Sequence, residues 1–221
     1  MRAKLLGALS VFVFAGVALP ARPASAKVEF QMFKLRAGSL IADFEFASDD
    51  ACIVTQTHIQ FSEAVIFQSG TPPTRQPPTT QVTLDYANAC TGEFFELTGG
   101  TTQQSVQIAG DLGKAHLIAT VPVSDDSGTN NANVSVDVTW TANAPLQRVK
   151  STNITHDANS ITVDRTNVQA RTADVVGPVS TVLMIQAGPT FFDLSRFPEG
   201  GQLGKDNEGA RTITFIPGHG H

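Results

Sequence analysis

The feature that most constrains the fold is an alternation of apolar and polar residues. From Val134 to Thr141 every even-numbered residue is apolar and every odd-numbered residue is polar. The stretches 40–46 and 82–86 repeat most of this pattern. A period of two residues is typical of a strand with one buried and one solvated face. Trp140 and Tyr86 fall in the apolar register, so we expect both rings in the core.

Many such strands, separated by turn residues, predict an all-β fold. We expect an antiparallel β-sandwich, or a partly closed barrel, of many short strands. Two stretches rich in proline or in glycine and charge, near residues 69–80 and 198–210, are expected to be long loops. We interpret residues 27–221 as a single domain, and a division into two subdomains at the proline-rich stretch is the alternative.

The N-terminus has the three parts of a secretory signal peptide. Arg2 and Lys4 precede an apolar run from Leu5 to Leu19, and the small residues Ala24-Ser25-Ala26 follow. The run of about 15 residues is shorter than the roughly 20 that span a bilayer, although an uncleaved anchor is the alternative. We therefore expect cleavage after residue 26 and a secreted bacterial protein, extracellular or periplasmic, that does not insert into a membrane.

The chain has two cysteines, Cys52 and Cys90. In an oxidising compartment such a pair predicts a disulfide, and a metal-binding or catalytic thiol is the alternative. A disulfide here would close a loop of about 40 residues and stabilise the fold by about 4 kcal/mol on the chain-entropy model.

The charge balance argues against nucleic-acid partners. The chain has 15 lysines and arginines against 20 aspartates and glutamates, and residues 1–26 contain only basic ones. An acidic surface repels phosphate backbones and anionic lipids, so we predict no nucleic-acid binding.

A weak resemblance involves the cysteines and one strand. Cys52, the stretch Cys90-Thr91-Gly92 and the strand 136–141 resemble small secreted β-proteins of bacteria that carry no assigned activity. The similarity spans the central half of the chain after residue 26. It implies an all-β secreted fold and supplies no catalytic residues.

No catalytic motif is found. The sequence contains neither the G-x-S-x-G of serine hydrolases nor the H-E-x-x-H of zinc hydrolases, and no glycine-rich phosphate loop. We name no catalytic residue. Glycosidases need only two carboxylates, which no short motif reports, so a hydrolase with scattered acidic residues remains the alternative function.

Two segments are candidates for metal binding. The turn with Asp125, Asp126 and Asn130 supplies the oxygen ligands that calcium prefers, but it also suits a solvated hairpin turn. His219 and His221 at the C-terminus could bind a transition metal, or form a polar tail. We expect no cofactor, and calcium is the alternative.

The absence of catalytic signatures and the polar, threonine-rich strand faces favour a non-enzymatic role. We predict a secreted binding or structural module, with an extracellular protein or a glycan as its partner.

Overall fold

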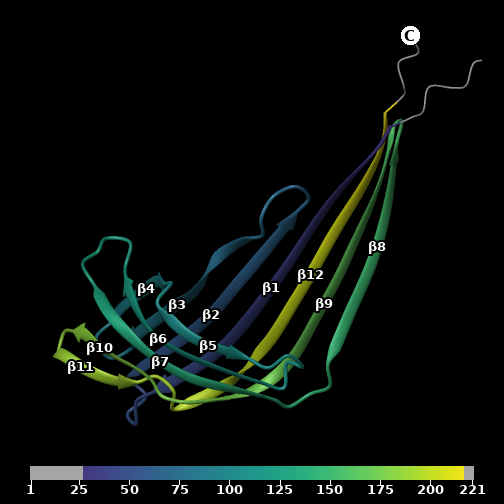
Figure 1. Ribbon diagram of the computed structural model, residues 1–221. Helices are drawn as coiled ribbons and strands as arrows, with labels where there is room; N and C mark the ends of the chain where they lie inside the picture. The colour runs from purple at the N-terminus through teal and green to yellow at the C-terminus, as the bar shows by residue number, and fades with distance from the viewer. Residues whose placement is uncertain (1–26, 217–221) are drawn as a thin grey trace, which may run out of the picture.

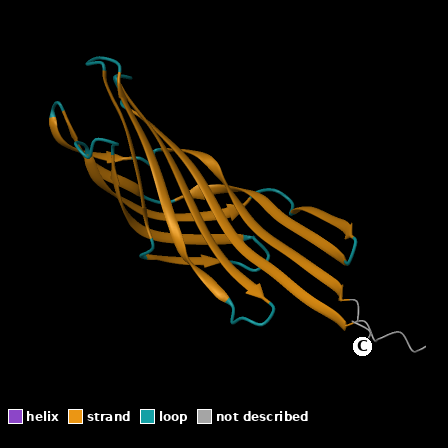
Figure 2. Cartoon of the chain, turned by 90° about the horizontal axis from the view of Figure 1, so that it is seen from above, coloured by secondary structure: helices purple, strands orange, loops and turns teal. Residues whose placement is uncertain are grey.

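The computed structural model describes residues 27–216, and within them the chain forms one antiparallel sheet of twelve strands and no helix (Figures 1 and 2). The strands are β1 (Lys27–Ala47), β2 (Ile53–Gln68), β3 (Thr74–Asn88), β4 (Glu93–Thr101), β5 (Gln104–Ile108), β6 (Lys114–Ser124), β7 (Asn131–Ala142), β8 (Gln147–Asp157), β9 (Ser160–Val176), β10 (Val179–Ile185), β11 (Gly188–Asp193) and β12 (Phe197–Ile216). The predicted all-β, antiparallel fold is confirmed. Several strands are much longer than expected, and β1 has 21 residues.

The sheet bends back on itself. Its strand order is β11-β10-β7-β6-β4-β3-β2-β1-β12-β9-β8, with β5 paired to β6. A second pairing joins β7 to β9, from Thr139↔Val176 to Ala142↔Ala173. Because β7 and β9 lie far apart in the strand order, this pairing makes one end of the sheet partly ring-like.

The hydrophobic core fills the inside of this bend. Leu40, Leu84 and Trp140 are fully buried, and the alternating strands direct their apolar positions into this one cluster. The Trp140 Nε1–H donates a hydrogen bond of 2.6 Å to the carbonyl oxygen of Ile41, which links β7 to β1. Tyr86 is also buried and stacks on Phe95 with ring centroids 4.6 Å apart. The expected core positions of Trp140 and Tyr86 are confirmed.

The predicted disulfide is confirmed. Cys52 and Cys90 are bonded across the β1–β2 and β3–β4 turns, and their Cα atoms lie 5.3 Å apart. Beside them the Ala89 N–H donates to the Cys52 carbonyl oxygen at 2.8 Å. A disulfide is compatible with an extracellular location. The described residues include no helix that could cross a bilayer.

The stretch near residues 69–80, expected to be a long loop, is mostly strand. After a short turn, β3 starts at Thr74 and pairs with β2. The register shifts where Ser62 opposes Thr79 and Ala64 opposes Gln76, and Pro77 and Pro78 fall in this irregularity. Prolines lack an N–H, and a bulge is where a strand tolerates them.

The stretch near residues 198–210 is likewise a strand rather than the expected loop. It belongs to β12, which is paired to β1 on one side and β9 on the other. Glycines weaken an isolated strand, but two flanking ladders outweigh that preference. Gly201 is also required sterically, because a Cβ there would lie 2.6 Å from the Ile41 carbonyl oxygen and 2.8 Å from Trp140 Nε1.

Several strands continue beyond the core as a projecting sheet, which we call the wing (Figure 1). It consists of residues 27–38 of β1, 63–68 of β2, 160–171 of β9, 203–216 of β12 and the whole of β8. The described chain begins and ends at the far end of the wing (Figure 1).

Candidate functional site

The two faces of the wing follow from the strand register. Antiparallel partners point to the same side of a sheet, and successive residues point to opposite sides. The wing face that continues the buried side of the core carries the even-numbered residues of β1 and β8 and the odd-numbered residues of β2, β9 and β12. We call this the inner face and the opposite one the outer face.

The inner face gathers most of the positive charge of the protein. Nine of the chain's fifteen lysines and arginines point to this side, eight from the wing and Arg75 from the adjoining start of β3, and we call them the basic belt. They are Lys34, Arg36, Arg75, Arg148, Lys150, Arg165, Arg171, Lys205 and Arg211. Among the described residues of the wing's inner face, Glu63 is the one acidic side chain.

The belt spans neighbouring strands in direct register. Lys34 opposes Gly209, and Gly209 opposes Arg165. One step along the strands, Arg36 opposes Asn207 and has Val65 on its other side, which in turn opposes Arg75. Adjacent strands are about 4.8 Å apart, and one strand lies between the two cations of each row. Their backbones are therefore only about 10 Å apart, so the two long side chains can reach the same ligand.

The belt cations have few partners of their own. No carboxylate of the described residues forms an ion pair with any of them. Lys205 Nζ donates to the Gly110 carbonyl oxygen at 3.0 Å, and Arg36 and Arg211 lie over the rings of Phe67 and Phe30. Nine like charges with one carboxylate on the same face repel one another, so an anion bound here would relieve that repulsion.

A hollow of about 490 Å³ lies in the middle of this face. Lys34, Arg165 and Arg211 are among its lining residues, and Gly209 forms part of its floor. A Cβ on Gly209 would have only the Phe33 carbonyl oxygen nearby, at 3.7 Å, so the missing side chain leaves open space. A second hollow, of about 360 Å³, lies on the other side of Lys34, between β1 and the end of β2.

The outer face of the wing has the opposite charge. Register places five acidic residues there: Glu29, Asp157, Asp164, Asp206 and Glu208. Polar residues, many of them threonines, and some apolar ones such as Phe33, Leu35 and Val168 occupy the positions between them. The wing is therefore a thin sheet with a basic inner face and an acidic outer face.

The calcium candidate turn is held together by its own hydrogen bonds. Asp125 Oδ1 accepts from Ser127 Oγ and from the Thr129 N–H, both at 2.9 Å, and Oδ2 accepts from Asn130 Nδ2 at 2.7 Å. Desolvation opposes the effect, but these hydrogen bonds lower the pKa of Asp125 below its ordinary value. A calcium ion at Asp125, Asp126 and Asn130 would have to replace these donors, so calcium binding stays a prediction.

An acidic cluster lies elsewhere, where β12 meets β1. A hydrogen bond to Glu45, then burial, then the negative charges of Glu45 and Asp43 raise the pKa of Glu199. His58 Nδ1 lies 2.7 Å from Oδ1 of Asp43 in the same cluster. The adjoining hollow, which includes Asp85, is only about 150 Å³.

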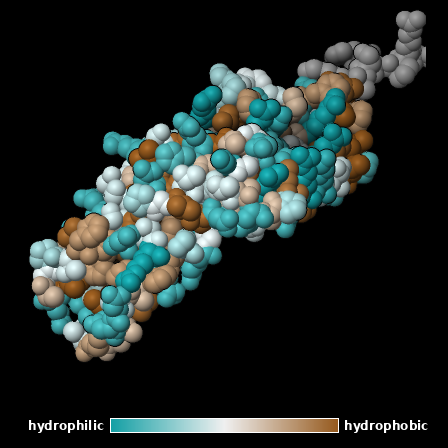
Figure 3. Space-filling view, turned by 90° about the horizontal axis from the view of Figure 1, so that it is seen from below, coloured by the Kyte–Doolittle hydropathy of each residue, from teal (hydrophilic) through white to brown (hydrophobic). Residues whose placement is uncertain are grey.

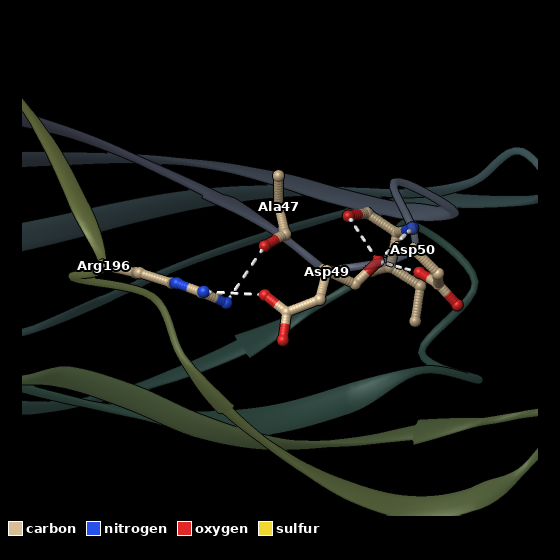
Figure 4. A network of polar contacts seen from close by, with 6 residues as sticks. Ala47, Asp49, Asp50 and Arg196 are labelled. Atoms are coloured by element: carbon tan, nitrogen blue, oxygen red, sulfur yellow. Dashed lines mark hydrogen bonds and ion pairs between the residues drawn. The ribbon is translucent and has the colours of Figure 1, made fainter.

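The remaining polar clusters are small. His116 Nε2 lies 2.6 Å from Asp137 on the outside of β6 and β7. Figure 4 shows Arg196 pointing toward Asp49 and Ala47, with Nη2 2.7 Å from Asp49 Oδ1, beside the turn that contains Asp50. The described residues contain no group of three or more histidine, cysteine, aspartate or glutamate side chains arranged to hold a metal. His219 and His221 lie outside the described residues.

Sequence reasoning missed the basic belt. Its nine members are spread from residue 34 to residue 211, and the net charge of the whole chain is negative. A signal was present in the alternation, since Arg36 and Lys34 share the parity of Leu40. Without the register of β9 and β12, however, that parity could not be extended to the other strands.

Comparison with known proteins adds no family: no family model matches the sequence, and no curated protein is significantly similar to it.

Proposed function

We propose that this protein is a secreted, non-enzymatic binding module that takes up an anionic ligand on the inner face of the wing. The observation that carries the proposal is the basic belt, nine cations on one face of an otherwise acidic protein. Carboxylate, sulfate and phosphate groups match that face, and acidic glycans and acidic protein segments carry them.

Secretion is part of this proposal. The signal-like residues 1–26 and the Cys52–Cys90 disulfide support it together, because disulfides persist in oxidising compartments. The net negative charge of the chain disfavours nucleic acids as ligands, because a long polyanion would be repelled by the acidic surface outside the belt.

The test is binding of dextran sulfate, with neutral dextran for comparison, at low and high salt. We expect dextran sulfate alone to bind, and Arg165→Glu to weaken binding about fivefold, because it reverses a charge inside the belt. Lys114→Glu is the matched control, since it changes the net charge equally at an exposed position of β6 outside the wing. Equal losses in the two variants would contradict the proposed surface.

A hydrolase is the second candidate, and the Glu199 cluster is the observation behind it. A carboxyl group with a raised pKa beside other carboxyl groups is an arrangement that acid–base catalysis uses. Glu199 itself is exposed and the adjoining hollow is small, which favours the binding module. Turnover of a glycoside panel that disappears in Glu199→Gln would reverse that preference.

A further inference from the structure

The inner face of the wing becomes apolar beyond the basic belt. Eight apolar residues on this face form what we call the apolar patch. They are Val28, Phe30, Met32, Ile154, Ile161, Val163, Ile213 and Phe215. Phe30 is 58% exposed and Met32 60%, although the patch is part of a continuous strand ladder. Figure 3 shows hydrophobic side chains gathered at the end of the wing, beside the grey residues, with hydrophilic ones next to them.

The patch and the belt meet in direct register. Phe30, Ile213 and Ile161 form one row across β1, β12 and β9. The next row toward the core contains Met32 and Val163 with Arg211 between them, and the row after that contains Lys34 and Arg165. The polarity of the face therefore changes over about 7 Å, the length of two strand residues.

The size of the patch suits an acyl chain. From residue 28 to residue 32 of β1 the patch extends about 14 Å along the strands, and it spans about 14 Å across β1, β12, β9 and β8. One leaflet of a bilayer has a hydrocarbon thickness of about 15 Å. The hollow of about 490 Å³ lies where the two regions meet, because Met32, Val163 and Ile213 line it together with Lys34, Arg165 and Arg211.

We infer that the wing binds a single anionic amphiphile, a lipid with a phosphate or carboxylate head group. The acyl chain lies on the apolar patch, and the head group lies at Lys34, Arg165 and Arg211. Gly209 provides the space for the head group, since any side chain there would occupy the hollow. The inference rests on the proposed function and narrows its ligand to a lipid.

Two other occupants fit less well. A hydrophilic polyanion would neutralise the belt but leave the apolar patch exposed to water. Its binding would therefore lack the favourable free energy of burying apolar area, about 25 cal/mol per Å². A bilayer that took up the end of the wing would also have to take up the outer face there. That face carries Glu29, Asp157 and Asp164, and carboxylates are costly to place in hydrocarbon.

The experiment compares dodecyl phosphate, kept below its micellar concentration, with butyl phosphate by isothermal titration calorimetry on residues 27–221. Both probes have the same head group, so the ratio of their affinities reports the acyl chain alone. We expect dodecyl phosphate to bind at least about tenfold more tightly, because burying each additional methylene contributes up to about 0.8 kcal/mol.

Three variants locate the two ends of the probe. Phe30→Ser should weaken dodecyl phosphate about fivefold and leave butyl phosphate unchanged, whereas Arg165→Glu should weaken both. Gly209→Val should weaken both while keeping the melting temperature, because its backbone has an ordinary φ and its Cβ points into open space. Phe191→Ser is the control for Phe30→Ser, since Phe191 is 66% exposed on β11, outside the wing.

The outcomes separate this inference from the proposed function. Equal affinities for the two phosphates, with dextran sulfate still bound through Arg165, would overturn the amphiphile and keep the anion-binding module. No binding of any of the three probes would overturn both. Binding to anionic vesicles without binding of monomeric dodecyl phosphate would overturn the single-lipid inference in favour of a membrane surface.

Discussion

At the scale of single residues, the same kinds of side chain have different roles because their neighbours differ. Arg196 has a carboxylate partner in Asp49, whereas Arg165 has none among the described residues. Asp125 is surrounded by donors that favour its ionised form, and Glu199 is beside carboxylates that disfavour it. An unpaired cation or a carboxyl group crowded by like charge marks a position where ligand or proton binding would be favourable.

The raised pKa of Glu199 predicts that Glu199→Gln raises the melting temperature of the protein at neutral pH but not at acidic pH. A carboxyl group with a raised native pKa holds its proton more tightly in the folded state. The contribution of Glu199 to folding stability is fully present below the ordinary glutamate pKa of 4.5 and is lost as the pH rises through the raised pKa. The glutamine variant carries no charge, so its melting temperature should exceed that of the original protein at pH 7.5 and equal it at pH 4.

Thermal unfolding followed by circular dichroism at the two pH values measures this difference. Glu96→Gln is the control, because Glu96 is an exposed glutamate of β4 outside the cluster. A gain of the same size at both pH values would mean that charge repulsion at Glu199 is not its cause.

At the scale of elements, the disulfide and the prolines act at opposite ends of β3. The disulfide fastens the β3–β4 turn to the β1–β2 turn, and the Pro77-Pro78 pair is accommodated in an irregularity near the start of β3. The segment between the prolines and Cys90 is paired on both sides, to β2 and to β4. Three neighbouring strands are thus held in register independently of the wing.

Removing the disulfide should therefore destabilise the fold without changing its strand pairing. We expect the double variant Cys52→Ser, Cys90→Ser to lose about 4 kcal/mol of unfolding free energy, since the open loop regains conformational freedom in the unfolded state. Urea unfolding measures the loss, and far-ultraviolet circular dichroism checks the strand content. Reductant should shift the original protein toward the variant and leave the variant unaffected; an unshifted midpoint would contradict the role given to the bond.

At the scale of the whole molecule, one contact across the core couples ring closure to the wing. Trp140 extends from β7 and donates its hydrogen bond to Ile41 of β1, and its indole lies against Gly201 of β12. Both β1 and β12 continue directly into the wing. Support for the binding face therefore depends on packing inside the bend.

Trp140→Phe should lower the unfolding free energy by about 2 kcal/mol or more, because it leaves the Ile41 carbonyl oxygen without its donor and opens a cavity. Chemical denaturation measures the loss, and Phe94→Leu on the exposed side of β4 is a control that should change stability little. A Trp140→Phe protein as stable as the original would show that the contact does not support ring closure.

The sequence by itself determined the strand character, the buried face of the core strands and the pairing of the only two cysteines. These properties are local or combinatorially simple: a period of two residues assigns a face, and two cysteines allow one intrachain bond. The alternation at 134–141 and at 40–46 is therefore sufficient to identify core residues such as Trp140 and Leu40.

Only the tertiary structure decided the strands at 74–80 and 197–216, the bend that joins β7 to β9, and the candidate binding face. Glycine and proline favour loops in isolation, and the flanking ladders that overrule them come from residues far away in the sequence. The basic belt arises for the same reason. Lys34, Arg165 and Arg211 share a face only because β12 lies between β1 and β9, and strand order is a property of long-range pairing that no local pattern encodes.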